Sequence, residues 1–206
     1  MSLAALPCLR VERNPSATFP TALTDCLRRY GFAVVEDHGI DGALIDRVGA
    51  EARALFALPQ SAKLGYRIAG GAGQRGYTPF AVETAKTTAH ADLKEFWHIG
   101  RDIGEGAMNV WPAELPTFRD DAVELYAAFE HLGVRLLSAI GAGLGLPTGL
   151  LEEAVRDGDS VLRLLRYPSG DFAGPSLRAA AHEDINAITL LLGAEEAGLE
   201  ILDRDG

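Results

Sequence analysis

A histidine and an aspartate stand two positions apart near the end of the chain. His182 and Asp184 flank Glu183, and the apolar run 187–192 follows them. If this segment forms a strand, the side chains of His182 and Asp184 point to the same face, because strand side chains alternate with a period of two. One imidazole beside one carboxylate suits a ferrous ion held by two histidines and a carboxylate, a ligand set that leaves coordination positions open. The spacing predicts two of the three ligands of an iron site.

The segments around this triplet favour a metal site. A His-x-Asp sequence on its own arises readily by chance in a chain of this length, and the alternative is a hydrogen-bonded surface pair. Here the triplet opens a strand pattern, follows a strand-like segment that carries Tyr167-Pro168, and precedes the strand-like residues 198–202. The neighbouring segments therefore favour an iron site over a hydrogen-bonded surface pair.

A helical first part and a strand-rich last part are expected to position the triplet. Apolar residues at helical spacing predict helices over 20–30, 41–58, 116–143 and 150–155. Gly31 is suited to end the first helix and Asp41 to cap the second. Strands are expected at 32–35, 160–167, 178–184, 187–192 and 199–202, and a hairpin turn at 203–206.

The glycine-rich segment 65–76 offers a second chemistry, a phosphate-binding loop. It lacks the Gly-Lys-Ser/Thr ending of a P-loop and does not stand between a clear strand and a clear helix. A connecting segment is the better interpretation.

Composition and charge exclude several classes of protein. The chain has 206 residues, 48% apolar and 23% charged, so it is long enough for one sizeable domain or two small ones. Its net charge of −10 argues against a general nucleic-acid binder. Cys8 and Cys26 make neither a disulfide framework nor a zinc ribbon, and neither a signal peptide nor an apolar run of about eighteen residues is evident. We therefore expect a cytoplasmic protein without a membrane span.

The remaining histidines are weaker candidates for ligands. His131 lies within the long predicted helix, where an exposed histidine is the expected role, and His38 stands in a turn before Gly39. His90 and His98 fall in the middle of the chain, where contact with a substrate is one interpretation and an exposed or hydrogen-bonded histidine is the other.

Several ordered motifs resemble a known family. They are Tyr30–Phe32 with Asp37–Ile40 ("GFF…NHGI"), Arg75–Tyr77 ("GY"), Asp92–Phe96 ("D-x-K-E"), Asn109–Pro112, Leu115–Arg119 ("L-P-x-F-R"), Leu165–Pro168 ("N-Y-Y-P") and Ala181–Asp184 ("A-H-T-D"). Together they resemble the isopenicillin N synthase-like group of 2-oxoglutarate- and iron(II)-dependent oxygenases. The resemblance implies an α+β, mainly β fold, in which a double-stranded β-helix, or jelly roll, lies behind a helical N-terminal region. It also implies a mixed region over 1–115 and, over 116–206, a scaffold helix with the first strands of the jelly roll.

The resemblance implies roles for four residues. His182 and Asp184 become iron ligands, and Tyr167 lies beside 2-oxoglutarate, where its hydroxyl donates to a carboxylate. Arg163 stands where relatives often have a basic residue, so a supporting role toward the cosubstrate is expected. Leu165 replaces the usual asparagine and removes an amide that could bind cosubstrate or substrate. No residue is assigned as a catalytic acid or base.

The implied activity is oxidation, most often hydroxylation, of a small molecule by dioxygen, with conversion of 2-oxoglutarate to succinate and CO2. Relatives have a distal histidine ligand and an Arg-x-Ser pair that binds the far carboxylate of 2-oxoglutarate, and both would lie beyond Gly206. We therefore expect the 206 residues alone to be inactive. Two alternatives stay open: an oxidase of this fold that does not use 2-oxoglutarate, and a noncatalytic jelly-roll binding module. Neither the substrate nor the oligomeric state follows from the sequence.

Overall fold

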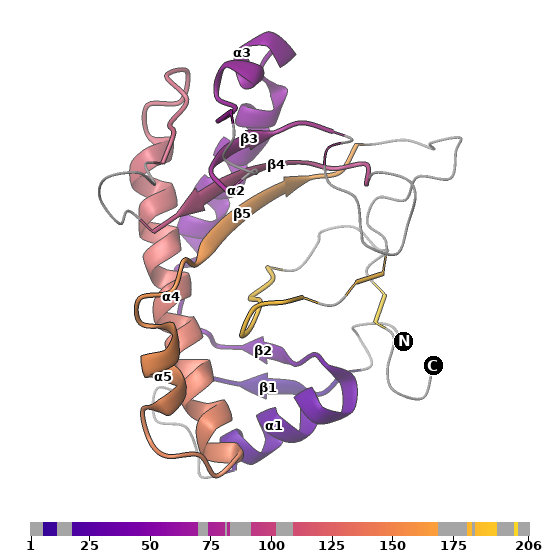
Figure 1. Ribbon diagram of the computed structural model, residues 1–206, viewed down its shortest axis with the longest axis vertical. Coiled ribbons are helices and arrows are strands. Elements are labelled where there is room, and N and C mark those ends of the chain that lie inside the picture. Colours follow the sequence, from indigo (N-terminus) through magenta and orange to yellow (C-terminus); the bar gives the residue numbers. More distant parts are fainter. Residues whose placement is uncertain are drawn as a thin grey trace. The chain divides into compact units, whose positions relative to one another are not determined.

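The computed structural model of the chain contains two compact units that interleave along the sequence (Figure 1). The structure describes residues 6–11, 18–69, 74–80, 82, 92–101, 109–168, 181–182, 184–192 and 200–201. One unit is formed by 1–40, 128–158 and 186–206, and the other by 41–127 and 159–185. The predicted division into 1–115 and 116–206 stays a prediction.

The first unit pairs two short parallel strands with a helix. Strand β1 (Cys8–Arg10) lies beside β2 (Val34–Glu36), and helix α1 (Phe19–Tyr30) lies between them in sequence. The helix ends as predicted at Gly31, whose φ of 70° is left-handed and whose amide donates to the carbonyl of Leu27. The core of this first unit consists of Val11, Phe19, Leu23, Leu132, Leu136 and Ala139. The β1 strand was not predicted, because three residues carry almost no periodic signal.

The second unit is built on a three-stranded antiparallel sheet with the order β3-β4-β5 (Figure 1). The strands are β3 (Gly76–Thr78), β4 (Glu95–Gly100) and β5 (Val161–Arg166), and in the register Trp97 pairs with both Tyr77 and Leu164. Strand β5 confirms the prediction at 160–167. Strands β3 and β4 were missed, although β3 carries the "GY" motif and β4 begins at Glu95, the last residue of the "D-x-K-E" motif.

Helices complete both units. Helix α2 (Gly42–Ala57) begins where predicted, because the Asp41 carboxylate accepts a hydrogen bond from the amide of Ala43. Helix α3 (Gln60–Gly65) follows it. Helix α4 (Phe118–Gly143) is the predicted long helix, and α5 (Leu150–Val155) matches its predicted bounds.

One face of the sheet packs on α2 and α4. The buried cluster there consists of Leu55, Phe56, Tyr77, Trp97, Ile99, Phe118 and Ala122, with Leu162 and Leu164 against it. Trp97 and Phe118 meet edge to face, with ring centroids 6.2 Å apart. This packing fixes β5 against the helices and leaves its odd-numbered residues on the opposite face of the sheet.

The predicted strand at 187–192 is wrong, since these residues form no strand. Ile188 and Leu190 alternate because they pack on the apolar cluster that α1 and α4 provide. The Asn186 amide nitrogen lies 3.0 Å from the Thr189 hydroxyl and 3.3 Å from the Ile188 carbonyl, and such local bonds compete with a strand ladder.

Other predicted strands are only partly described. Ala181, His182 and Asp184 are not in a strand, and Glu200 forms an isolated bridge. The hairpin turn at 203–206, the glycines at 70–73 and His90 lie outside the described residues.

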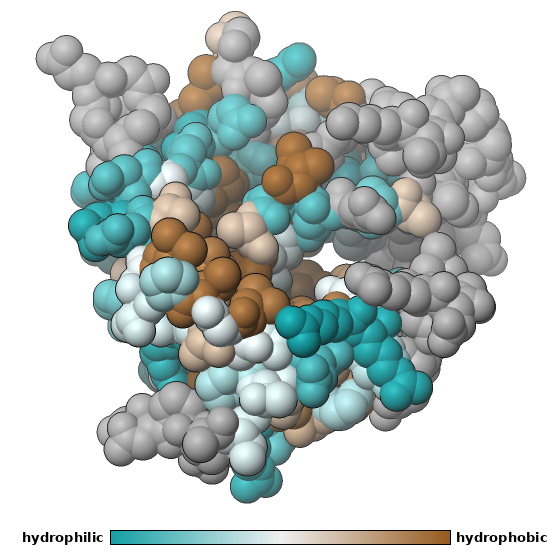
Figure 2. Space-filling view, turned by 60° about the horizontal axis from the view of Figure 1, so that its bottom comes forward, coloured by the Kyte–Doolittle hydropathy of each residue, from teal (hydrophilic) through white to brown (hydrophobic). Residues whose placement is uncertain are grey.

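Some apolar side chains remain exposed, among them Ile185 at 95% and Leu191 at 57%. Figure 2 shows apolar side chains gathered on part of one face, bordered by hydrophilic ones. Among the described helices, none is both long enough and apolar enough to span a bilayer.

Candidate functional site

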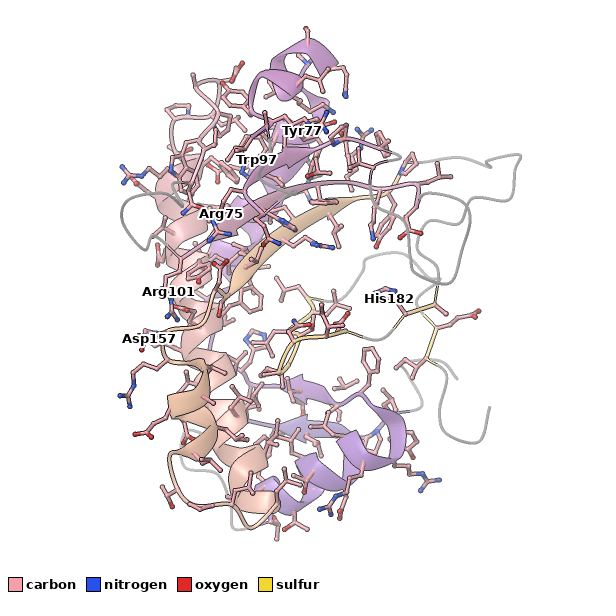
Figure 3. All side chains as sticks on the ribbon, in the orientation of Figure 1. Arg75, Tyr77, Trp97, Arg101, Asp157 and His182 are labelled. Atoms are coloured by element: carbon pink, nitrogen blue, oxygen red, sulfur yellow. The ribbon has the colours of Figure 1, made fainter. Side chains whose placement is uncertain are left out.

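The predicted ligand pair lies together in the structure. The Nε2 atom of His182 is 3.5 Å from Oδ1 of Asp184, although the two residues are not in a strand. Their side chains are 55% and 48% exposed, so both donors are accessible. Figure 3 shows His182 on a segment outside the three-stranded sheet. A neutral imidazole nitrogen and a carboxylate oxygen are donors that fit ferrous iron.

Two donors do not complete a metal site. Within the described ranges, no cluster of three or more histidine, cysteine or carboxylate side chains could hold a metal ion. His98, which belongs to the same unit, therefore does not join the pair as a third protein ligand. The residues present fit two positions of an iron site and leave the third protein ligand unassigned.

Arg163 and Leu165 lie on the sheet face opposite the core. Their β5 neighbours Leu162 and Leu164 pack on the core, so the alternation of strand side chains turns these two residues away from it. Tyr167 directly follows the strand and is 39% exposed. The structure gives no contact between Tyr167 and the His182–Asp184 pair, so their joint role stays a prediction.

Arg163 contacts two side chains of β4. Its Nε atom donates to Nε2 of His98 at 2.5 Å, and its guanidinium carbon lies 4.6 Å from the centroid of the Phe96 ring. The Phe96 and His98 rings are themselves 4.6 Å apart. His98 is 5% exposed, so it is a buried, hydrogen-bonded histidine. Sequence reasoning did not connect it with Arg163, because the link depends on the β4–β5 register.

A buried ionic cluster holds the other end of β5. The Glu95 carboxylate is fully buried and accepts from Lys63 Nζ at 2.7 Å, the Tyr77 hydroxyl at 2.6 Å and Arg166 Nη1 at 2.7 Å. Both Lys63 and Arg166 also donate to the Phe56 carbonyl. Burial, followed by the bond to Glu95, raises the pKa of Tyr77 above its ordinary value, so Tyr77 stays protonated. The cluster thereby fixes the residue that precedes Tyr167.

A small cavity of about 160 Å³ lies between β4 and α4. Its lining includes Arg101, Asn109, Trp111, Arg119 and Tyr126. The Asn109 side chain accepts a hydrogen bond from the backbone amide of Gly100 and donates one to the Gly100 carbonyl. None of the four residues predicted for the site lines this cavity.

Comparison with known proteins settles the family. Residues 6–114 match the family model described as non-haem dioxygenase in morphine synthesis N-terminal. A crystal structure of a 2OG-Fe(II) oxygenase family protein from Caulobacter crescentus is 46% identical with a TM-score of 0.86, over 98% of this chain and 68% of that one. The chain belongs to the 2-oxoglutarate/iron(II)-dependent oxygenase family. The fold is therefore that of these oxygenases.

Other members of the oxygenase family are more distant. The 2-oxoglutarate-dependent dioxygenase caaD of Aspergillus niger is 31% identical over 85% of this chain and 58% of its own length. A full-length Neurospora crassa protein, solved in complex with alpha-KG, is 26% identical with a TM-score of 0.70, over 79% of this chain and 54% of that one. The present oxygenase chain thus spans somewhat more than half the length of these two relatives.

Proposed function

We propose that the protein is an iron(II)- and 2-oxoglutarate-dependent oxygenase that oxidises a small molecule, most often by hydroxylation, with release of succinate and CO2. The observation that carries this proposal is the 3.5 Å approach of His182 and Asp184 in a chain of this oxygenase family. Strands β3, β4 and β5 would then belong to its jelly-roll core.

His182 and Asp184 would each supply one donor to iron(II). The imidazole must be neutral to offer its nitrogen lone pair, and the carboxylate must be ionised, so binding weakens in acid. The carboxylate also offsets part of the charge of the cation. Iron(II) held by these two residues would supply the chemistry that activates dioxygen for oxidation of the substrate.

Tyr167 and Arg163 would bind the cosubstrate. A tyrosine hydroxyl donates one hydrogen bond to a carboxylate, and a guanidinium donates a charge-assisted pair. The core packing of Leu164 and the pairing of Arg166 with Glu95 fix the strand that carries Arg163 and ends just before Tyr167. Positioning of the cosubstrate by these neighbours would be a second contribution of this chain, beside the two iron ligands.

The test is formation of succinate from 2-oxoglutarate by the purified full-length protein that carries this chain, with and without added ferrous iron and a panel of small-molecule substrates. We expect formation that requires iron, rises with a substrate and disappears in His182→Ala and Asp184→Ala. His131→Ala and Asp46→Ala are matched controls on helices and should keep it. Full turnover in both ligand variants would contradict the assignment, and oxygen uptake without 2-oxoglutarate would indicate an oxidase instead.

A further inference from the structure

The small cavity between β4 and α4 has no part in the proposed function. Its volume is about 160 Å³, and an apolar protein cavity of about 150 Å³ is large enough to bind benzene. All of its described lining residues belong to the second unit, and one of them, Arg101, is seen beside α4 in Figure 3. The cavity therefore has room for a ligand with one small ring.

The walls of the cavity offer apolar contact area. On α4, Val123 and Tyr126 follow Arg119 by four and seven positions, so these three side chains lie on one face of the helix. Ile99 from β4 and Trp111 add to the apolar lining. Aromatic rings and branched aliphatic side chains are the groups that line most small-molecule sites.

Hydrogen bonds to backbone groups hold these walls in place. The Tyr126 hydroxyl donates to the Ser160 carbonyl at 3.2 Å, which ties α4 to the residue before β5. The Asn109 side chain bonds both the amide and the carbonyl of Gly100, which ties its segment to the end of β4. A cavity with fixed walls loses little conformational entropy when a ligand enters.

The cavity has a positive edge in an acidic protein. Arg101 and Arg119 line it and none of its described lining residues is acidic, although the chain carries a net charge of −10. Arg101 makes a further interaction within the chain, so the inference rests on Arg119. Arg119 is exposed and, among the residues that the structure describes, has no partner in a hydrogen bond or ion pair. It stands in the first turn of α4, where the helix dipole disfavours a cation, so helix stability does not account for it.

We propose that this cavity binds a small carboxylate that carries one aromatic ring. The ring occupies the apolar interior, and the carboxylate pairs with the guanidinium of Arg119 at the exposed edge. The planar fork of an arginine matches the two oxygens of a carboxylate. None of the four residues assigned to iron or 2-oxoglutarate lines the cavity, so this site is additional to the proposed function.

Calorimetric titration of the purified full-length protein with benzoate tests the proposal. Excess 2-oxoglutarate and Mn²⁺ are present, so that the proposed iron site is occupied by other ligands. Arg119→Met removes the charge at similar length, and Val123→Phe fills the cavity while Arg119 stays in place. Arg53→Met, at an exposed arginine on α2, is the matched control. Unfolding midpoints confirm that each variant is folded.

We expect Arg119→Met and Val123→Phe each to weaken benzoate binding by about tenfold or more, because the first loses a charge-assisted hydrogen bond and the second loses the space for the ring. Arg53→Met should bind benzoate as the wild type does. Benzyl alcohol, which lacks the carboxylate, and inorganic phosphate, which lacks the ring, should both bind more weakly than benzoate. Unchanged benzoate affinity in both cavity variants overturns the proposal, and so does phosphate binding as tight as that of benzoate, which would indicate a simple anion site.

The proposed function fails separately from this inference. Benzoate binding that requires Arg119, in a protein that forms no succinate, would support the cavity site and contradict the proposed function. Iron-dependent succinate formation, with a benzoate affinity that ignores Arg119 and Val123, would do the reverse.

Discussion

The ammonium group of Lys63 lies 2.7 Å from the Glu95 carboxylate, and the side chains are 4% and 0% exposed. Ionic groups removed from water stabilise a fold only when each is paired, because the loss of one partner leaves a buried charge. Glu95 also pairs with Arg166, which is 46% exposed and belongs to β5. This cluster therefore ties β4, β5 and helix α3 together.

Glu95→Leu is expected to lower the free energy of unfolding by about 3–5 kcal/mol, since it leaves Lys63 buried without a carboxylate. Lys63→Met should cost less, because Arg166 and Tyr77 still donate to Glu95. Urea denaturation measures both. Arg47→Met, at a more exposed pair with Asp121, should cost about 1 kcal/mol or less. Equal losses at the buried and exposed pairs would contradict this account.

The raised pKa of Tyr77 predicts that the free energy of unfolding falls in alkaline solution. Its pKa is raised in the folded protein, so the folded state holds the proton more tightly than the unfolded chain. The contribution is fully present below the unfolded pKa of about 10 and is lost as pH rises toward the folded value. Tyr77→Phe should therefore flatten the decline in stability above pH about 10.

Urea midpoints between about pH 8 and about pH 11.5, on both sides of the ordinary tyrosine pKa, measure that decline. Tyr30→Phe, at the end of α1, is the control and should follow the wild type. Parallel curves for wild type and Tyr77→Phe would show that Tyr77 does not contribute.

Gly100 is expected to tolerate no side chain while Arg75 keeps its position. A Cβ on Gly100 would overlap the guanidinium carbon of Arg75, which is 5% exposed and donates to Asp159 at 2.6 Å. Gly100→Ala should therefore destabilise the protein by about 1–3 kcal/mol through overpacking.

A double-mutant cycle tests the cause of that loss. In an Arg75→Ser background the overlapping atoms are gone, so Gly100→Ala should cost less than in the wild type, with a coupling above about 0.5 kcal/mol. Urea denaturation of the four proteins gives the coupling energy. Additive losses would mean that Arg75 is not the obstacle.

Local signals in the sequence predicted α1, α2, α4 and α5, whereas the short helix α3 was not predicted. Gly31 ends α1 because it adopts the left-handed backbone conformation, and Asp41 begins α2 because its side chain caps the amide of Ala43. The apolar stripe of α4 was long enough to predict that helix directly. Strand β4 was not predicted, because all six of its residues are buried, including Glu95 and His98. Its sequence therefore does not show the alternation of polar and apolar residues that marks a half-buried strand. The sheet therefore had to be found in the structure.

In the candidate site, too, sequence spacing predicted the local contact but not the contacts between distant residues. His182 and Asp184 are neighbours in sequence, so spacing alone brought them together. Arg163 and His98 are 65 residues apart, and Arg166 and Glu95 are 71 apart, so only the pairing of β4 with β5 places them in contact. The run 187–192 misled the strand prediction, because packing on helices also produces an alternating pattern.

Metal affinity of the purified protein tests the iron site most directly. Mn²⁺, a redox-stable substitute for ferrous iron, is titrated and free ion is followed by electron paramagnetic resonance in wild type, His182→Ala, Asp184→Ala and the control His131→Ala. Loss of an outer-shell partner costs 10- to 100-fold in affinity, so loss of a ligand should cost about 100-fold or more. We predict that loss in the two ligand variants and wild-type affinity in the control. Equal affinity in all four proteins would contradict an iron site at His182 and Asp184.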